Sequence, residues 1–340
     1  MMSFFVSLLL FVCKVVVVFL AIFLVLIMIA SLKKQKRQQK TPSIFQLRSL
    51  NEYYEDMVNQ FDTLLDKKEL KQLEKTKKKE EKAKKKSEKE EPLKKPYLYV
   101  LDFDGDVQAS SMEDVRDQIS ALIQIAKPED EVLLRLNSPG GYVHSYGFAS
   151  SQLMRFKEHG IKLTVVVDMV AASGGYMMAC VADQLIAAPF AIIGSVGVYA
   201  GIPNINELLE KNHVHYEMHT AGKFKRTLTV MGKNTDEGRA QFQKELTETH
   251  ELFKQHIQQM RPQLDVESIA TGETWYGQVA LEKGLVDKLG TSDDYIMAHL
   301  KTHKIVQLEK EEPMTIWDKL KHQVSATLQA PFLPFKNYIR

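Results

Sequence analysis

Cysteine is nearly absent from this chain of 340 residues, which has only Cys13 and Cys180. The first lies in an apolar N-terminal segment and the second in a run of small residues, so we expect no disulfide between them. Both are interpreted more simply as small hydrophobic side chains. A disulfide-stabilised scaffold is therefore excluded.

Several common functional patterns are also missing. Neither glycine pair is followed by Gly-Lys-Ser/Thr, and the glycine spacing is not that of a dinucleotide site, which argues against a phosphate cradle. The pattern Gly-x-Ser-x-Gly is absent, so an α/β-hydrolase elbow is not supported. No repeat period is found. No ATP-binding motif is found either, so we expect that this chain does not unfold stably folded proteins without a partner.

Basic charge is scarce outside two tracts near the N-terminus. Residues 33–40 contribute +5, and residues 67–95, with 14 Lys and 7 Glu, contribute +7. The whole chain carries only +2, so the remainder sums to −10. This distribution argues against a body that binds nucleic acid, and it is compatible with tracts lying against anionic lipid headgroups.

A long apolar run is present at the N-terminus. Residues 15–32 are uncharged and as a helix would reach about 27 Å, close to the hydrocarbon thickness of a bilayer. A cleaved signal peptide is the alternative, but the run is long and stops at a basic cluster, which favours an uncleaved anchor over 1–32. The positive charges after the span place the rest of the chain in the cytoplasm by the positive-inside rule.

Composition divides the rest of the chain into three parts. Residues 33–95 are predicted to be a basic linker, helical over 41–66 and low in complexity afterwards. Residues 96–300 are predicted to be the folded domain, and 301–340 a C-terminal tail.

The folded part alternates between strand and helix patterns. This alternation predicts an α/β domain of right-handed βαβ units with a mostly buried sheet. Strands are expected over 97–103, 131–136, 162–169 and 213–220, and helices over 112–126, 145–160, 174–182, 205–212 and 235–260.

Two expected strands end in glycine pairs that begin helices. One is Gly140-Gly141, and the other is Gly174-Gly175, which directly follows Ser173. Glycine allows a sharp turn and leaves backbone N–H groups uncovered, so two such loops could point N–H groups at one developing oxyanion. The alternative is that both are only tight turns; the serine beside one pair favours catalysis, with Ser173 as a candidate nucleophile.

The group that would accept the proton of Ser173 is not marked by one motif. No Ser-His-Asp order is readable among the ten histidines, and His213 and His215 lack further ligands, so neither a metal nor any other cofactor is expected. A lysine is the other possible base, because desolvation favours its uncharged form. Lys223 and Lys225 are both candidates.

Five motifs in order resemble the signal peptide peptidase (protease IV) family of membrane serine proteases, and most closely its single-domain, SohB-type branch. They are "NSPGG", "ASGGY", "GSVGV", "AGKFKR" and "TGETWYGQVALEKGLVD". The resemblance implies a Clp-protease/crotonase-like fold and a Ser–Lys dyad. It departs from the family at Ala221-Gly222 and at a missing proline just beyond.

The resemblance also implies a role for each matching residue. The nucleophile falls on Ser173, and the Gly-x-x-Lys spacing from Gly222 selects Lys225 as the base. Ser195 would hold the lysine amine. Oxyanion donors fall on Gly140, Gly141 and Gly174.

The family further implies where the protein works and on what. It implies a single-pass protein of the bacterial inner membrane, a homo-oligomer with shared active sites, and substrates such as signal peptides or membrane-protein fragments. The family implies that substrates are cleaved on the far side of the inner membrane, whereas the charges beside the span favour a folded body in the cytoplasm. A crotonase-like acyl-CoA enzyme and an inactive membrane-tethered scaffold are the alternatives.

Overall fold

The computed structural model describes residues 45–61 and 95–310. The predicted membrane anchor over 1–32, most of the linker and the end of the tail lie outside these ranges. No helix within the described ranges is long and apolar enough to cross a bilayer.

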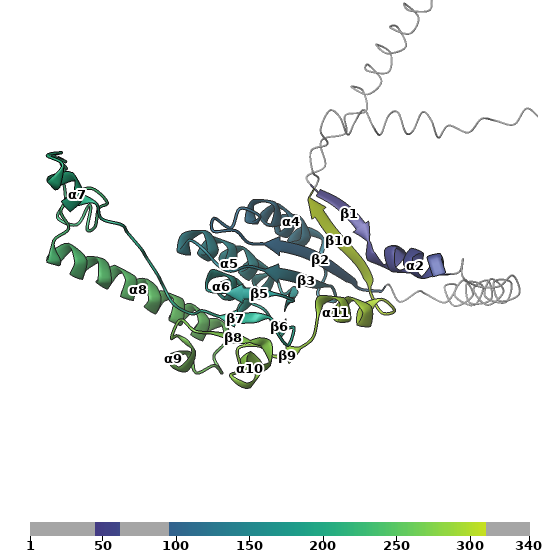
Figure 1. Cartoon of the computed structure of the whole chain (residues 1–340). Helices are drawn as coiled ribbons and strands as arrows, with labels where there is room; N and C mark the ends of the chain where they lie inside the picture. Colours follow the sequence, from purple (N-terminus) through teal and green to yellow (C-terminus); the bar gives the residue numbers. More distant parts are fainter. Residues whose placement is uncertain (1–44, 62–94, 311–340) are drawn as a thin grey trace, which may run out of the picture. The chain divides into compact units, whose positions relative to one another are not determined.

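A seven-stranded sheet forms the centre of the body, in the order β1-β10-β2-β3-β4-β6-β9 (Figure 1). All neighbours pair in parallel except β1 and β10, which are antiparallel. This arrangement confirms the predicted α/β class, because parallel neighbours need crossover connections. The strands are β1 (Phe45–Ser49), β2 (Tyr97–Asp104), β3 (Glu131–Asn137), β4 (Lys162–Val167), β6 (Gln184–Ala187), β9 (Lys288–Leu289) and β10 (Lys304–Lys310).

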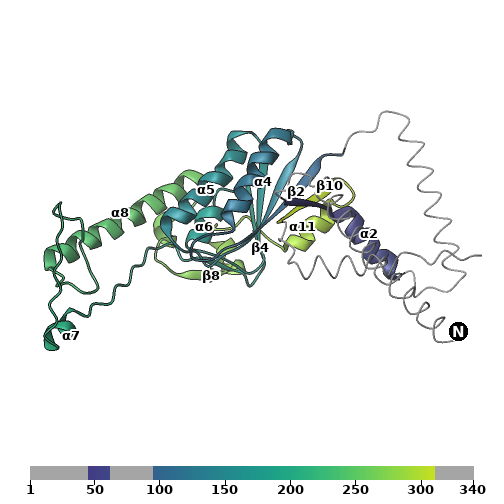
Figure 2. The ribbon, with the colours of Figure 1, turned by 90° about the horizontal axis from the view of Figure 1, so that it is seen from above.

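Helices cover both faces of this sheet (Figures 1 and 2). Alternate residues of β2 show the two faces, since Leu101 packs in the larger apolar cluster and Val100 in the smaller one. The larger cluster includes α4 (Met112–Ile125), α5 (Val143–Glu158) and α6 (Gly174–Ala179). The smaller includes residues of α2 (Leu50–Phe61) and α11 (Ser292–His299).

A second, three-stranded sheet lies at the end of β3. Its order is β5 (Val170–Ala172), β7 (Ile192–Gly194) and β8 (Thr274–Tyr276). Ser138, just after β3, forms a bridge with Ala171 of β5 and so joins the two sheets. This junction brings the segments after β3, β5 and β7 together.

The region between β7 and α8 (Asp236–Met260) projects from the body as an arm (Figures 1 and 2). We define the arm as residues 199–235; it includes α7 (Asn206–Lys211) and bonds with itself, for example from Ile205 N–H to Val230 O at 2.8 Å. The C-terminal part of α8 returns to the body, where Phe253 and Ile257 are buried. Two short helices follow, α9 (Val266–Ile269) and α10 (Gly277–Glu282).

Two expectations about local structure differ from the observed fold. The strand expected over 213–220 is wrong, because these residues are exposed and pair with no strand in the part of the chain that the structure describes. Of the helix expected over 41–66, the structure describes 45–61, where Leu50–Phe61 form a helix and Phe45–Ser49 instead form β1 beside β10. With β1, α2 and β10 in the body, the folded unit extends beyond 96–300 on both sides.

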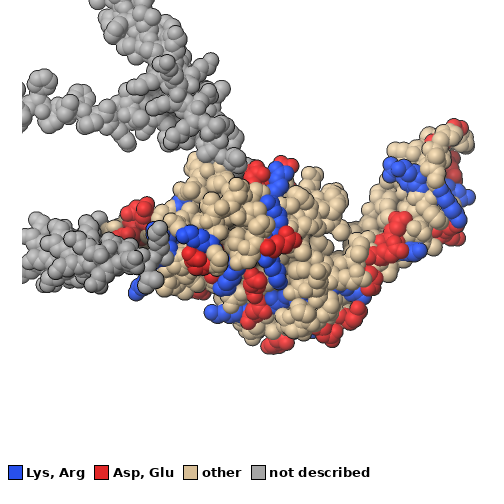
Figure 3. Space-filling model, turned by 180° about the vertical axis from the view of Figure 1, so that it is seen from behind, with Lys and Arg blue, Asp and Glu red and all other residues tan. Residues whose placement is uncertain are grey.

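Charge on the face shown in Figure 3 is mixed. Lys and Arg alternate with Asp and Glu over the body and the arm instead of gathering in one basic field. This face has none of the broad positive surface with which proteins track a phosphate backbone.

Candidate active site

Ser173 stands at the junction of β5 and α6 in a strained conformation. Its φ of 52° and ψ of −118° are unusual for a residue with a side chain. Two backbone hydrogen bonds hold it, from Ser173 N–H to Gly194 O (2.8 Å) and from Met177 N–H to Ser173 O (3.0 Å). Strain of this kind concentrates at functional sites, where the surrounding structure fixes a side chain in one direction.

The two glycine loops are in direct contact. Gly140 has a φ of 88°, and a β-carbon there would lie 2.8 Å from Gly174 N. The N–H groups of Gly141 and Gly174 have no hydrogen-bond partner among the described residues, whereas Gly140 N–H donates to Ser138 Oγ at 3.1 Å. Gly141 and Gly174 are therefore the pair of donors that remains open toward a ligand.

An open cleft of about 410 Å³ runs past Ser173. Its lining includes Ser195, which has a φ of 54° and is held by a 2.6 Å hydrogen bond from its N–H to Glu273 O. The structure thus brings Ser173 and Ser195 to one cleft beside the glycine loops. The rest of the lining is Pro139, Gly140, Gly141, Val143, Gly197, Val198, Tyr199 and Gly272.

A small pocket opens from the cleft next to Ser173. It holds about 10 Å³, room for about one water-sized group. Apolar groups dominate its wall, which Val143, Met177, Thr249 and Phe253 form together with the glycine loops. The pocket is therefore a small, mostly apolar recess directly beside Ser173.

The predicted lysines do not lie in this cleft. Lys223 and Lys225 are both exposed on the arm, and Lys223 pairs with Glu237 at 2.5 Å. Lys225 bonds through its backbone N–H to Gly222 O at 3.2 Å. Among the residues that the structure describes, no lysine, histidine or carboxylate lines the cleft. The described part of one copy thus presents the serines and the glycine loops to the cleft without a base.

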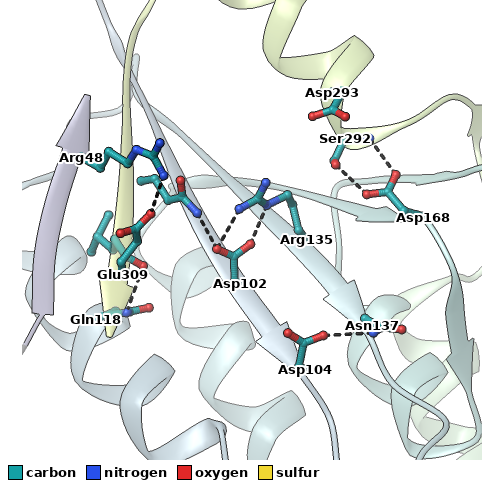
Figure 4. A network of polar contacts seen from close by, with 12 residues as sticks. Arg48, Asp102, Asp104, Gln118, Arg135, Asn137, Asp168, Ser292, Asp293 and Glu309 are labelled. Carbon is teal, nitrogen blue, oxygen red and sulfur yellow. Dashed lines mark hydrogen bonds and ion pairs between the residues drawn. The ribbon is translucent and has the colours of Figure 1, made fainter. Parts of the chain in front are cut away.

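A polar network on the sheet fixes the strand that carries the first glycine loop (Figure 4). The guanidinium of Arg135 in β3 donates two hydrogen bonds, of 2.5 and 2.8 Å, to the carboxylate of Asp102 in β2. Gln307 of β10 donates to the same carboxylate at 2.8 Å. Burial alone would lower the pKa of Arg135, but the bonds with Asp102 outweigh it and raise the pKa above its usual value. These contacts tie β3 to β2 and β2 to β10, and the "NSPGG" loop begins at the end of β3.

Two buried residues behind the loops were not found from the sequence. Ser138 and Tyr146 hydrogen-bond to each other at 2.6 Å, and both are fully buried. Ser138 lies inside the "NSPGG" motif, and Tyr146 is eight positions further along with no pattern to mark it. Only the fold shows that they meet.

Comparison with known proteins confirms the resemblance drawn from the motifs. Residues 3–153 match the Peptidase family S49 N-terminal domain, and residues 155–307 match Peptidase family S49. "Probable protease SohB" of Haemophilus influenzae is 58% identical over 219 residues, which are 64% of this chain and 62% of that protein. "Probable protease SohB" of Buchnera aphidicola subsp. Schlechtendalia chinensis is 48% identical over 82% of this chain and 93% of that protein.

Among solved structures, the comparison finds the ClpP protease catalytic domain from Plasmodium falciparum. It is 12% identical, has a TM-score of 0.36, and the match covers 58% of this chain and 85% of that chain. Both matching families are described as peptidases, and both relatives are named as probable proteases. The chain therefore belongs to peptidase family S49.

Proposed function

We propose that the protein is a membrane-anchored serine endopeptidase in which Ser173 of one copy works with Lys225 of a neighbouring copy. The observation that carries the proposal is the incomplete cleft. A strained serine stands beside two loops with open N–H donors, yet the described residues supply no base there. The lysine that the family resemblance selects stands on an arm that leaves its own body.

The chemistry follows from these positions. Uncharged Lys225 takes the proton of Ser173, whose oxygen attacks the peptide carbonyl and forms a tetrahedral intermediate. The N–H groups of Gly141 and Gly174 stabilise its oxyanion, and Ser195 orients the lysine amine. The C–N bond then breaks, the amine product leaves with the proton, and water hydrolyses the acyl-enzyme by the reverse sequence.

The surface of the arm supports a neighbouring copy as its partner. A single arm presents many large apolar side chains to solvent, which is costly unless another surface covers them. Docking the arm on a second copy would bury this surface and deliver Lys225 to a cleft at the same time. The exposed residues include Tyr199, Leu208, Val214, Tyr216, Met218 and Phe224.

The sequence supports attachment to the bacterial inner membrane through residues 15–32, with signal peptides or membrane-protein fragments as substrates. The basic cluster after the span favours a cytoplasmic body, and the family resemblance favours the periplasm. Protease digestion of intact spheroplasts distinguishes the two, because only a periplasmic body would be degraded before lysis.

The test is peptide hydrolysis by the detergent-purified full chain. Ser173→Ala and Lys225→Ala should each lose at least about 10⁴-fold in kcat, as expected for groups that act as a unit. Lys223→Ala is the matched control and should keep its activity, because its amine is already paired with Glu237.

Mixing the two inactive variants tests the sharing of sites. If they are co-expressed with different tags and co-purified, random assembly should restore about a quarter of the wild-type activity, since a quarter of the sites would combine both intact groups. A co-purified mixture that stays inactive would contradict the shared dyad. Full activity of Lys225→Ala would overturn that lysine as the base.

A further inference from the structure

A chain of three hydrogen bonds runs behind the first glycine loop. Tyr146 OH donates to Asp106 O at 2.7 Å, which uses its only proton. The 2.6 Å contact between Tyr146 and Ser138 therefore has the Ser138 hydroxyl as donor. Ser138 Oγ in turn accepts the N–H of Gly140 at 3.1 Å. The donor of each bond is thus fixed: Gly140 donates to Ser138, Ser138 to Tyr146, and Tyr146 to Asp106 O.

The ring of Tyr146 also touches the second glycine loop. Tyr146 is fully buried, and a β-carbon at Gly174 would collide with its ring. The backbone of Ser138 approaches the same loop, since a β-carbon at Gly175 would lie 2.6 Å from Ser138 O. Ala172 N–H, just before Ser173, donates to Ser138 O at 3.0 Å. Ser138 and Tyr146 together therefore contact both loops.

We propose that Tyr146 and Ser138 are positioning residues of the oxyanion hole, which set the separation and direction of the Gly141 and Gly174 N–H groups. This inference rests on the proposed peptidase function. Oxyanion donors act only when they lie about 2.7–3.1 Å from the developing charge, so the spacing of the two loops decides the rate. Tyr146 holds one loop through its hydroxyl and the other through its ring.

The hydrogen bond to Gly140 has a specific consequence for the loop. It occupies the Gly140 N–H behind the cleft and leaves the next N–H, that of Gly141, open. Burial raises the pKa of Tyr146, so its hydroxyl stays a neutral donor at any pH at which the enzyme would work. A tyrosine that only filled space would not need this ordered chain of bonds.

The test compares Tyr146→Phe, Ser138→Ala and the double variant in the full-length protein. Tyr146→Phe keeps the ring and removes only the hydroxyl. We expect kcat for a peptide substrate to fall at least about tenfold with KM within about twofold, because a transition-state interaction is lost while substrate binding is kept. The double variant should lose no more than the single variants, since both break one chain of bonds.

The matched control is Tyr295→Phe. It removes another hydroxyl hydrogen bond, to Glu131, in the smaller apolar cluster on the other face of the sheet. It should lower the melting temperature at least as much as Tyr146→Phe and leave kcat unchanged. An equal fall of kcat in both proteins would assign the effect to general stability and overturn the inference.

Amide hydrogen exchange supplies a readout that does not depend on activity. In Tyr146→Phe and Ser138→Ala, the Gly140 amide should exchange at least about tenfold faster than in the wild type, whereas Tyr295→Phe should leave it unchanged. Unchanged exchange, or unchanged kcat in an active enzyme, would overturn the positioning role. If Ser173→Ala were as active as the wild type, the proposed function would fail, and exchange at Gly140 would still decide whether these residues hold the loop.

Discussion

Gly140 and Ser173 are in direct contact: a β-carbon on Gly140 would lie 2.8 Å from the β-carbon of Ser173 and 2.7 Å from Ala172 O. Ser173, the proposed nucleophile, and the Gly140-Gly141 loop thus pack against each other with no space for a side chain between them. The positive φ of 88° at Gly140 adds a second reason for glycine, because other residues rarely adopt it. Any side chain at position 140 must push the loop away from Ser173.

Gly140→Ala should therefore lose about 100-fold or more in peptide hydrolysis, because a displacement of about 1 Å at reacting groups has an effect of this size. Strain at positive φ should also lower the free energy of unfolding by about 1–2 kcal/mol. Gly147→Ala is the control, since a β-carbon there meets nothing within 4 Å. Alanine in the interior of α5 should stabilise by about 0.5–1 kcal/mol, and wild-type activity in both variants would contradict the close packing.

Phe253 is the largest side chain in the wall of the small pocket beside Ser173. Phe253→Leu should widen this pocket, so kcat/KM should shift toward peptides with a larger apolar residue before the cut bond. One methylene in such a pocket is worth about 1–3 kcal/mol of discrimination. The measurement is a comparison of alanine, valine and leucine peptides.

Phe156→Leu is the control for that experiment. Phe156 is fully buried on α5 and lines neither the cleft nor the pocket. The substitution should lower stability without changing the order of preferred peptides. An unchanged order in Phe253→Leu would show that another part of the cleft selects the substrate.

Glu131 makes stability depend on pH. Burial acts to raise the pKa of this carboxylate, but hydrogen bonds from Thr164 (2.6 Å) and Tyr295, together with Lys162, outweigh burial and hold it below the ordinary 4.5. Since the folded-state pKa lies below the unfolded one, the ionised group adds stability above about pH 4.5. This contribution is lost as the pH falls through the folded-state value.

Urea unfolding of Glu131→Gln at pH 7 and pH 3 checks this dependence. At pH 7 the variant should be less stable than the wild type by about 1.5–3 kcal/mol, the usual contribution of a hydrogen bond to a charged group. At pH 3 the difference should shrink, because below about pH 4.5 the carboxylate of the unfolded wild type takes up a proton more readily than that of the folded protein. An equal difference at both pH values would mean that ionisation of Glu131 adds nothing to the free energy of unfolding.

The sequence predicted those parts of the site that depend on local pattern. Strand, glycine pair and helix follow one another within a few residues at both loops, and Ser173 stands at the predicted turn. Contacts between distant segments left no such pattern. β1 is short and pairs with β10 more than 250 residues later, so its sequence alone resembled the start of a helix.

Position 225 shows the same limit in a different way. The motif selected a lysine, but its distance from Ser173 depends on the arm, and the helix-like and strand-like patterns within the arm do not predict the direction in which it projects. Residues 213–220 alternate like a strand, yet alternation without a neighbouring strand leaves them exposed. The pairing of Ser138 with Tyr146 likewise depends on how α5 packs against the loop.

The arm gives the last prediction. Leu208 on α7 is 59% exposed and belongs to the apolar surface that we assign to contact with a second copy. Leu208→Glu should leave the fold of the body intact, because the side chain is not part of its core. It should weaken assembly, since a charge would have to be buried without a partner at the interface. Sedimentation of the detergent-solubilised protein should show smaller species, and peptide hydrolysis should fall in parallel.

Leu252→Glu separates this effect from a general one. Leu252 is 66% exposed on the part of α8 that lies against the body, outside the arm. The same change of charge there should leave both assembly and activity unchanged. If Leu208→Glu remained fully active while sedimenting as a single copy, each chain would complete its own site, and Lys225 would have to reach Ser173 by a movement of its own arm.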